Sequence, residues 1–298
     1  MRRAPLLGLA MIALPVFVIT LFIGLPVVLG IIYTLGHTGG PNSNLAAIAQ
    51  HQHVSQGGWG TGAAYTEVLS DSQNLRDLVL TVLVTAISVV VILVIAWSIA
   101  LYLRLSGSRI AKGFAALSVV PLFIPVVIAS YAIRQFYNAD GAFRGLMHAI
   151  GWTNPPVLSS TTAGITIAEI WVSIPFAVLM VSSGLAAVPN SLIEAARDAG
   201  ASLPRTVRAV LIPMCSIPTV IAVTFTAITI LGSFTVPYLT GPASPNMLGV
   251  TMQHYFGSFS EPQQAEVLAV VVFVIASLAA VFYIRSNAKA ARRSGAAS

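Results

Sequence analysis

Long runs of apolar residues recur along the chain, and the longest of these runs extends without a charge from Leu6 to Tyr33. The hydrocarbon core of a bilayer is about 30 Å thick, a distance that about 20 helical residues cross. Only 8% of the 298 residues are charged, whereas an average soluble domain has about a quarter. These features exclude a soluble enzyme and predict an all-α integral membrane protein.

Six apolar runs are long enough to cross a membrane, and an even number places both termini on the same side. The first run is close to twice the length of a signal-peptide core of roughly 7–15 residues, so we expect it to be retained. The six predicted transmembrane helices are Leu6–Tyr33, Leu78–Leu103, Phe114–Ile133, Thr162–Leu185, Pro213–Tyr238 and Val267–Ile284.

Basic residues predict the orientation, because cytoplasmic loops carry an excess of Lys and Arg. With the N-terminus inside, only Arg76, Arg134 and Arg144 lie outside, so we expect both termini in the cytoplasm. The scattered basic residues form no single face that would bind nucleic acid. The 12 of 15 basic residues expected inside are Arg2, Arg3, Arg104, Arg109, Lys112, Arg197, Arg205, Arg208, Arg285, Lys289, Arg292 and Arg293.

The segment 187–213, between the fourth and fifth runs, predicts two short helices separated by a bend. Asn190 or Ser191 can cap the first helix. Gly200 suits the end of that helix, and Pro204 suits the start of the next. A short helix of small residues on the cytoplasmic side is suited to docking into a groove of a partner.

This segment resembles the EAA motif of permease subunits in binding-protein-dependent ABC importers. The motif is Glu-Ala-Ala, three residues, Gly, nine residues and Ile-x-Leu-Pro. Here Glu194-Ala195-Ala196 precedes Gly200 by three residues, and Val210-Leu211-Ile212-Pro213 follows after nine. Val210 and Ile212 replace Ile and Leu conservatively.

The resemblance implies a type I ABC importer permease fold in the bacterial plasma membrane, with a cytoplasmic coupling helix that docks into an ATPase. The coupling residues that it implies are Glu194, Ala195, Ala196, Asp198, Gly200 and Pro213. The implied partners are an ATPase dimer that binds ATP and Mg, a second permease subunit (a paralogue or a copy) and an extracytoplasmic solute-binding protein. The sequence has no G-x-x-x-x-G-K-[ST] loop, so we expect a transport subunit that is not itself an enzyme and holds no cofactor.

Two domains are expected on this basis. Residues 1–75 form the first transmembrane helix and an extracytoplasmic segment. Residues 76–298 form a permease core of five transmembrane helices that includes the coupling loop 187–213.

Polar side chains follow one face of two predicted transmembrane helices. Glu169 is a carboxylate inside the fourth run, where a charge costs on the order of 3 kcal/mol. Its helical spacing places it with Thr166 and Ser173, which predicts either a polar path or a structural hydrogen-bonding site. The full set of candidate path residues is Glu169, Thr166, Ser173, Thr226, Thr229, Ser233 and Phe234.

The solute is suggested only by resemblance. Residues 232–242 and 246–249 are similar to the corresponding region of polyamine-type permeases, while sugar, iron and opine importers remain alternatives. A secondary transporter or channel would predict inverted repeats or paired intramembrane carboxylates, and neither is found.

The remaining candidate ligands are few. His51 and His53 lie in the first outside segment with no carboxylate or cysteine close in sequence, so we expect no metal site there. Cys215 is the single cysteine and is expected to be a small buried residue in a helix.

Overall fold

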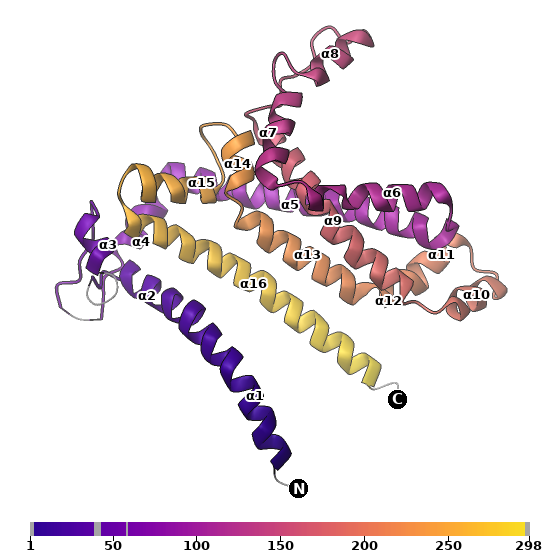
Figure 1. Ribbon diagram of the computed structural model, residues 1–298, viewed down its shortest axis with the longest axis horizontal. Helices are drawn as coiled ribbons and strands as arrows, with labels where there is room; N and C mark the ends of the chain where they lie inside the picture. The colour runs from indigo at the N-terminus through magenta and orange to yellow at the C-terminus, as the bar shows by residue number, and fades with distance from the viewer. Residues whose placement is uncertain (1–2, 39–42, 58, 296–298) are drawn as a thin grey trace. The chain divides into compact units, whose positions relative to one another are not determined.

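The computed structural model describes residues 3–38, 43–57 and 59–295, in which the regular secondary structure is helical (Figure 1). The chain divides into two compact units. The first unit comprises residues 1–75 and 251–272, and the second comprises residues 76–250 and 273–298. Arg2, one of the basic residues that predict the orientation, lies outside the described residues.

The first unit begins with a long helical segment that has an exposed apolar surface. Phe17 and Phe22 are 61% and 70% exposed, as expected for side chains that face lipid. The segment consists of α1 (Arg3–Ile19), a π-helical turn η1 (Thr20–Gly24) and α2 (Leu25–Thr34). Further helices of this unit are α3 (Ser43–Ile48), α4 (Ala63–Ser70), η5 (His254–Ser258) and the first turns of α16 (Pro262–Gly295).

The second unit is organised around α9 (Thr162–Ala186), which contacts several other helices of this unit. Ile165, Val181 and Leu185 of α9 are fully buried in its apolar core. The other elements are α5 (Ser72–Ser106), α6 (Arg109–Val119), η3 (Val120–Phe123), α7 (Val126–Phe136), α8 (Ala142–Ala149), α10 (Asn190–Asp198), α11 (Leu203–Thr206), η4 (Val207–Leu211), α12 (Ile212–Met214), α13 (Ser216–Leu231), α14 (Thr235–Thr240) and α15 (Leu248–Gln253).

Among the described residues, four helical segments are long and apolar enough to cross a membrane, or up to six if each of two bent helix pairs counts as one span. The four are Met11–Thr34, Ser72–Ser106, Thr162–Ala186 and Pro262–Val281. The multi-pass, all-helical class is therefore confirmed, while the count of six and the side of the termini stay predictions.

The third predicted span is not one continuous helix. Arg109–Phe123 and Val126–Phe136 meet at 110°. Pro121 and Pro125 explain this break, because proline lacks an N–H and forces the preceding residue out of the helical region. Ile124 accordingly has extended backbone, with φ −108° and ψ 120°.

The fifth predicted span is also interrupted. Leu203–Met214 and Ser216–Leu231 meet at 68°, and the second helix ends seven residues before the predicted limit at Tyr238. Cys215 is buried as expected but lies at the break rather than inside a helix. Pro218 supplies no N–H for the carbonyl of Met214, so a regular helix cannot continue through Cys215.

The packing of α9 against α13 depends on Gly184. A Cβ atom at this position would lie 2.6 Å from Cys215 Sγ and 2.7 Å from Pro218 Cγ. We expect Gly184→Ala to lower the free energy of unfolding by about 1–3 kcal/mol, because the added methyl group overpacks a close helix contact. The thermal unfolding midpoint of the purified chain in detergent measures this change.

Gly113→Ala is the matched control. It lies in α6, and nothing occupies the space of its Cβ within 4 Å. Alanine there raises helix propensity by up to about 1 kcal/mol, so the midpoint should stay or rise. An equal response of the two variants would contradict the proposed packing role of Gly184.

Candidate coupling loop and polar path

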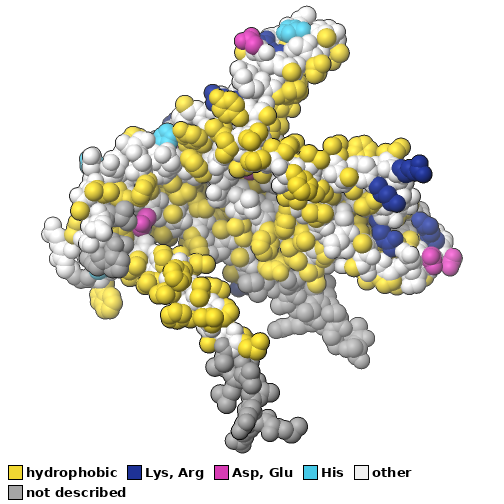
Figure 2. Space-filling view, viewed as in Figure 1, with side chains coloured by type: hydrophobic (Ala, Val, Ile, Leu, Met, Phe, Trp, Pro, Cys, Tyr) yellow, Lys and Arg dark blue, Asp and Glu magenta, His cyan; other side chains and the backbone are white. Residues whose placement is uncertain are grey.

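Helix α10 turns one side towards the core and the other outwards. Ile193 is 7% exposed and is the buried residue of this helix. Glu194, Ala195 and Asp198 are exposed, and Ala196 is half-buried. Figure 2 shows basic and acidic side chains gathered over the region of α6, α10 and α11. The predicted coupling residues of α10 are thus available to a partner.

The end of α10 is a regular helix stop built on Gly200. Its φ of +75° is in the left-handed region, where glycine has no steric penalty. The Gly200 N–H donates to Arg197 O at 2.8 Å, and the Ala201 N–H donates to Ala196 O at 2.9 Å. These two bonds form a Schellman motif, which fixes the bend between α10 and α11.

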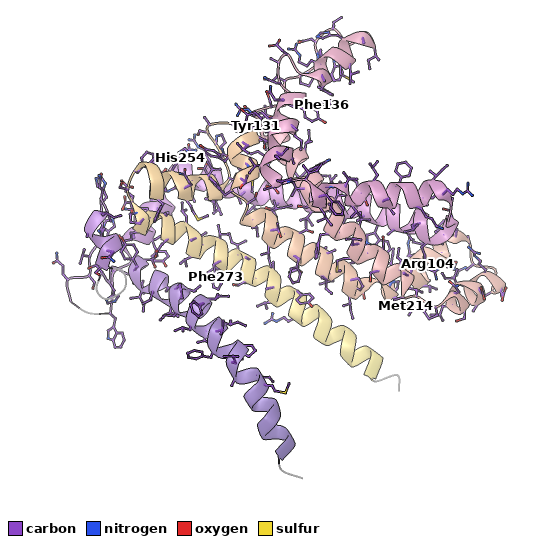
Figure 3. All side chains as sticks on the ribbon, in the orientation of Figure 1. Arg104, Tyr131, Phe136, Met214, His254 and Phe273 are labelled. Atoms are coloured by element: carbon purple, nitrogen blue, oxygen red, sulfur yellow. The ribbon has the colours of Figure 1, made fainter. Side chains whose placement is uncertain are left out.

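The start of α10 differs from the sequence expectation. Neither Asn190 nor Ser191 caps the helix, because Pro189 occupies the N-cap position and no side chain bonds there. Asn190 Oδ1 instead accepts a 2.5 Å hydrogen bond from Arg104 Nη2. Arg104 lies in the last turn of α5 (Figure 3).

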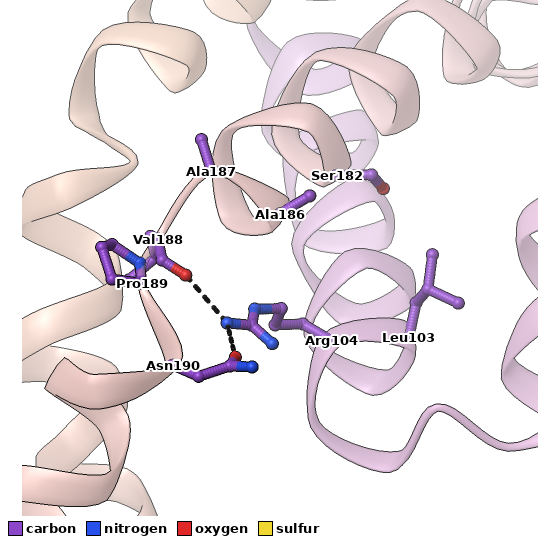
Figure 4. A pocket seen from close by; sticks show the side chains of 8 residues that line it. All are labelled: Leu103, Arg104, Ser182, Ala186, Ala187, Val188, Pro189 and Asn190. Atoms are coloured by element: carbon purple, nitrogen blue, oxygen red, sulfur yellow. Dashed lines mark hydrogen bonds between the residues drawn. The ribbon is translucent and has the colours of Figure 1, made fainter.

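Arg104 also binds the end of α9. Its Nε donates to Leu185 O at 3.0 Å, and its Nη2 donates to Val188 O at 2.8 Å. Figure 4 shows the guanidinium beside Val188 and Asn190, in a cavity of about 500 Å³. From the sequence, Arg104 was predicted only to be one of the cytoplasmic basic residues. Its position at the end of an apolar run was the one sequence feature that pointed to a contact with a helix end.

The end of the motif lies at the broken helix. Pro213 is an exposed residue of the three-residue helix α12, whereas Leu211 is fully buried. Leu211, with Val210 packed beside the core, therefore anchors this end of the loop in the second unit.

The structure brings several of the predicted polar residues together on α9 and next to it. Glu169 and Ser173 are 2% and 7% exposed on one face of α9. The Ser233 side chain is close enough to interact with Glu169. Thr226 is 3% exposed on α13, which packs along α9.

Three oxygens of this group have no hydrogen-bond partner among the described residues: Glu169 Oε1, Ser173 Oγ and Thr226 Oγ1. Buried polar atoms of this kind are uncommon and call for a ligand, water or partner chain.

Other candidate path residues are accounted for locally. Thr166 donates to Thr162 O at 2.8 Å, and Thr229 donates to Phe225 O at 2.9 Å. Such bonds to the preceding turn are common for threonine in membrane helices. Phe234 is partly exposed and stacks on Tyr238 with ring centroids 5.2 Å apart.

Two buried residues of α5 hold the irregular segment that follows α14. Asp77 Oδ1 accepts the Asn246 N–H at 3.0 Å, and Thr81 Oγ1 accepts the Leu248 N–H at 2.9 Å. Gly249, in the first turn of α15, packs so closely on the link between α13 and α14 that a Cβ would lie 2.3 Å from Ser233 O. Sequence reasoning missed Asp77, which immediately precedes the predicted span.

In the first unit, His51 and His53 each contact a carboxylate that is not adjacent in the sequence. His51 Nδ1 lies 2.8 Å from Glu261 Oε1, and His53 Nε2 contacts Glu67. No carboxylate is adjacent in the sequence, but the fold brings one to each of these histidines. In the part of the chain that the structure describes, no three potential metal ligands gather.

Two glutamines hold this histidine segment in place. Gln263 is fully buried and donates through Nε2 to Tyr33 O at 3.0 Å and to His53 O at 3.1 Å. Gln264 donates to His51 O at 2.8 Å.

A half-buried tyrosine, Tyr255, lies in the same unit. Burial raises the pKa of the Tyr255 hydroxyl, which accepts a hydrogen bond from Asn74 Nδ2 at 3.0 Å. Hydrogen bonds from Asn74, Gln263 and Gln264 thus hold polar groups of the first unit together.

Comparison with curated proteins finds relatives that are named for sugar and glycoside transport. The chain is 27% identical over 223 residues to the trehalose transport system permease protein SugA of Mycobacterium tuberculosis, covering 74% of this chain and 71% of that protein. It is 28% identical over 176 residues to the sulfoquinovosyl glycerol transport system permease protein SmoG of Agrobacterium fabrum. That match spans 56% of this chain and only 56% of the length of SmoG.

Solved structures share the fold. A chain of a bacterial alginate ABC transporter, in complex with an alginate pentasaccharide-bound periplasmic protein, superposes with a TM-score of 0.73 at 14% identity. The match covers 95% of this chain and 93% of that chain. A chain of the MetNI methionine ABC transporter gives 0.56 at 22% identity, covering 72% of this chain and 94% of that chain.

These likenesses show the type I ABC importer permease fold. Residues 58–292 match the family described as the binding-protein-dependent transport system inner membrane component. Because that match covers most of the sequence, the chain belongs to this family of membrane permeases.

Proposed function

We propose that this chain is one of two permease subunits of an ATP-driven importer and carries a saccharide or glycoside delivered by a binding protein. The observation that carries the proposal is the exposed α10 with its Glu194-Ala195-Ala196 sequence, closed by the left-handed Gly200. Within the family shown for the chain, such a helix is suited to docking on an ATPase.

The partners and cofactors follow from this function. An ATPase dimer binds ATP and Mg and docks on the coupling loop 187–213, on the side that we expect to be cytoplasmic. A second permease, most simply a paralogue, completes the path. Residues 1–75 supply the first span and the extracytoplasmic segment, and residues 76–298 supply the permease core.

The buried polar group on α9 supports a path for a polar solute. Glu169, Ser173 and Thr226 each carry an oxygen without a partner among the described residues. A hydroxyl-rich solute could both donate to and accept from such oxygens during passage. Ser233, next to Glu169, extends the same polar surface towards Phe234.

The choice of solute class follows the relatives. The names of SugA and SmoG refer to trehalose and to sulfoquinovosyl glycerol, both of which contain a sugar. A third relative, 29% identical over 186 residues, is the trehalose/maltose permease protein MalF of Thermococcus litoralis. These relatives do not support the polyamine expectation drawn from residues 232–249, and they favour the sugar alternative.

Uptake by cells tests the solute class. A strain that lacks this chain should lose uptake of at least one of radiolabelled trehalose, maltose or diacetylchitobiose, and a plasmid copy should restore it. Uptake of spermidine should not change. Loss of spermidine uptake alone, with saccharide uptake intact, would contradict the sugar proposal and support the polyamine interpretation.

Substitutions in the coupling loop test the mechanism. Gly200→Asp and Glu194→Lys should each reduce uptake to below about a tenth of the wild-type rate while the chain stays in the membrane. Aspartate is strained at the left-handed φ of Gly200, and lysine reverses the charge of an exposed contact residue.

Gly107→Asp is the control for these variants, because Gly107 also has a positive φ, +58°, in the turn between α5 and α6. It should retain uptake. Wild-type uptake in both coupling variants would exclude the coupling role of α10.

The path is tested by comparing the buried carboxylate of Glu169 with the half-buried carboxylate of Glu266. Glu169→Ala should slow uptake more than Glu266→Ala, when both rates are divided by the amount of chain in the membrane. Glu169 lies beside Ser173 in the proposed path, whereas Glu266 lies beside Gly30 in the first unit. Small and equal effects would assign Glu169 a structural role.

A further inference from the structure

Arg104 joins three segments of the second unit at one point. It belongs to the last turn of α5, and its hydrogen bonds end on α9, on the linker after α9 and on the first residue of α10. Arg104, Val188 and Asn190 line the cavity of about 500 Å³, which Figure 4 shows from close by. No part of the function proposed above uses this arginine.

The first bond adds a second donor at the end of α9. In a continuing helix, Leu185 O would accept from the N–H four residues later, but that residue is Pro189, which has no N–H. The Val188 N–H donates to this carbonyl at 3.3 Å, and Arg104 Nε donates to it at 3.0 Å. The negative end of the α9 dipole also favours a cation at this position.

The second and third bonds fix the link to α10. The Leu192 N–H donates to Pro189 O, so Val188 O is left for Arg104 Nη2. The same nitrogen reaches Asn190 Oδ1 at 2.5 Å, which uses the side chain that would otherwise cap α10. A planar guanidinium holds such acceptors in a fixed geometry, as a lysine ammonium cannot.

Few other contacts fix the position of α10. Ile193 is its single buried residue, and the residues proposed to meet the ATPase are exposed. Val188, by contrast, is 3% exposed and packs in the core, so the residue whose carbonyl Arg104 binds is itself held in place. The direction of α10 relative to α5 and α9 therefore depends strongly on this arginine.

We propose that Arg104 is a positioning residue that makes α5, α9 and α10 move as one body, so that displacement of α10 by the ATPase reaches the transmembrane helices. This inference rests on the proposed coupling function of α10. A residue that only stabilised the fold would change the amount of folded chain but would not change how α10 follows α5.

Spin labels measure directly whether α10 moves together with α5, in the full importer complex reconstituted in lipid. One label is placed at Tyr102 on α5 and one at Leu192 on α10, both of which have exposed side chains. Cys215→Ala removes the single native cysteine. Distances are recorded without nucleotide and with ATP and vanadate, so the measurement needs no knowledge of the solute.

With Arg104 present, we expect a narrow distance distribution that is the same in both nucleotide states. Arg104→Ala should broaden the distribution and make its mean shift between the states, while the ATPase still copurifies. Arg104→Lys, which offers one ammonium in place of the guanidinium, should lie between the two. Arg109→Ala is the control, since Arg109 is an exposed cation of the adjacent helix α6.

A distribution in Arg104→Ala that matches the wild type in both states would overturn the inference. If Arg104→Ala fails to fold, the Arg104→Lys and Asn190→Ala variants decide in the same way, because each removes part of the contact. A different result would contradict the proposed function but not the role of Arg104. In that case Gly200→Asp and Glu194→Lys would leave uptake intact, while the Arg104 variants would still broaden the distance distribution.

Discussion

The pairing of backbone polar groups where helices break governs much of this structure. Within a bilayer no water is available to the N–H and C=O groups that a proline or a helix end leaves unpaired. Side chains from other segments supply additional hydrogen bonds at these places. Arg104 of α5 serves Leu185 O and Val188 O at the end of α9, and Asp77 and Thr81 of α5 serve the amides of Asn246 and Leu248. One helix thus stabilises irregular segments near both of its ends.

This arrangement separates rigid and accessible parts within the second unit. The core around α9 is apolar and closely packed, to the point that Gly184 has no room for a methyl group. The coupling loop, in contrast, is fixed at its base by Arg104, Ile193 and Leu211 and is exposed along α10. A helix held at its base and exposed along its length can receive a partner without disturbing the core. The same chain can therefore provide a stable membrane scaffold and a docking element.

Patterns local in the sequence predicted the apolar class and the two short helices of the loop. Gly200 was recognised because a helix stop has its own residue preference, and the Schellman bonds confirm it. The 110° angle at Pro121 and Pro125 could not be predicted, because proline marks a break but tertiary packing sets its direction. Arg104, Asp77 and the pairing of His51 with Glu261 were missed for a related reason: each bonds a residue more than 80 positions away.

The predicted polar residues on α9 and α13 show what helical periodicity alone can and cannot predict about a site. Spacing along a helix identifies residues on one face but does not reveal which of them are satisfied by their own backbone. Thr166 and Thr229 bond the preceding turn, so their hydroxyls are already used. Glu169, Ser173 and Thr226 keep unpaired oxygens within the described structure, which is costly in a buried place unless something else meets them. Helical periodicity therefore identifies the polar face, and the hydrogen bonds show which of its oxygens lack a partner among the described residues. Only those oxygens are free to bind a polar solute in the proposed path.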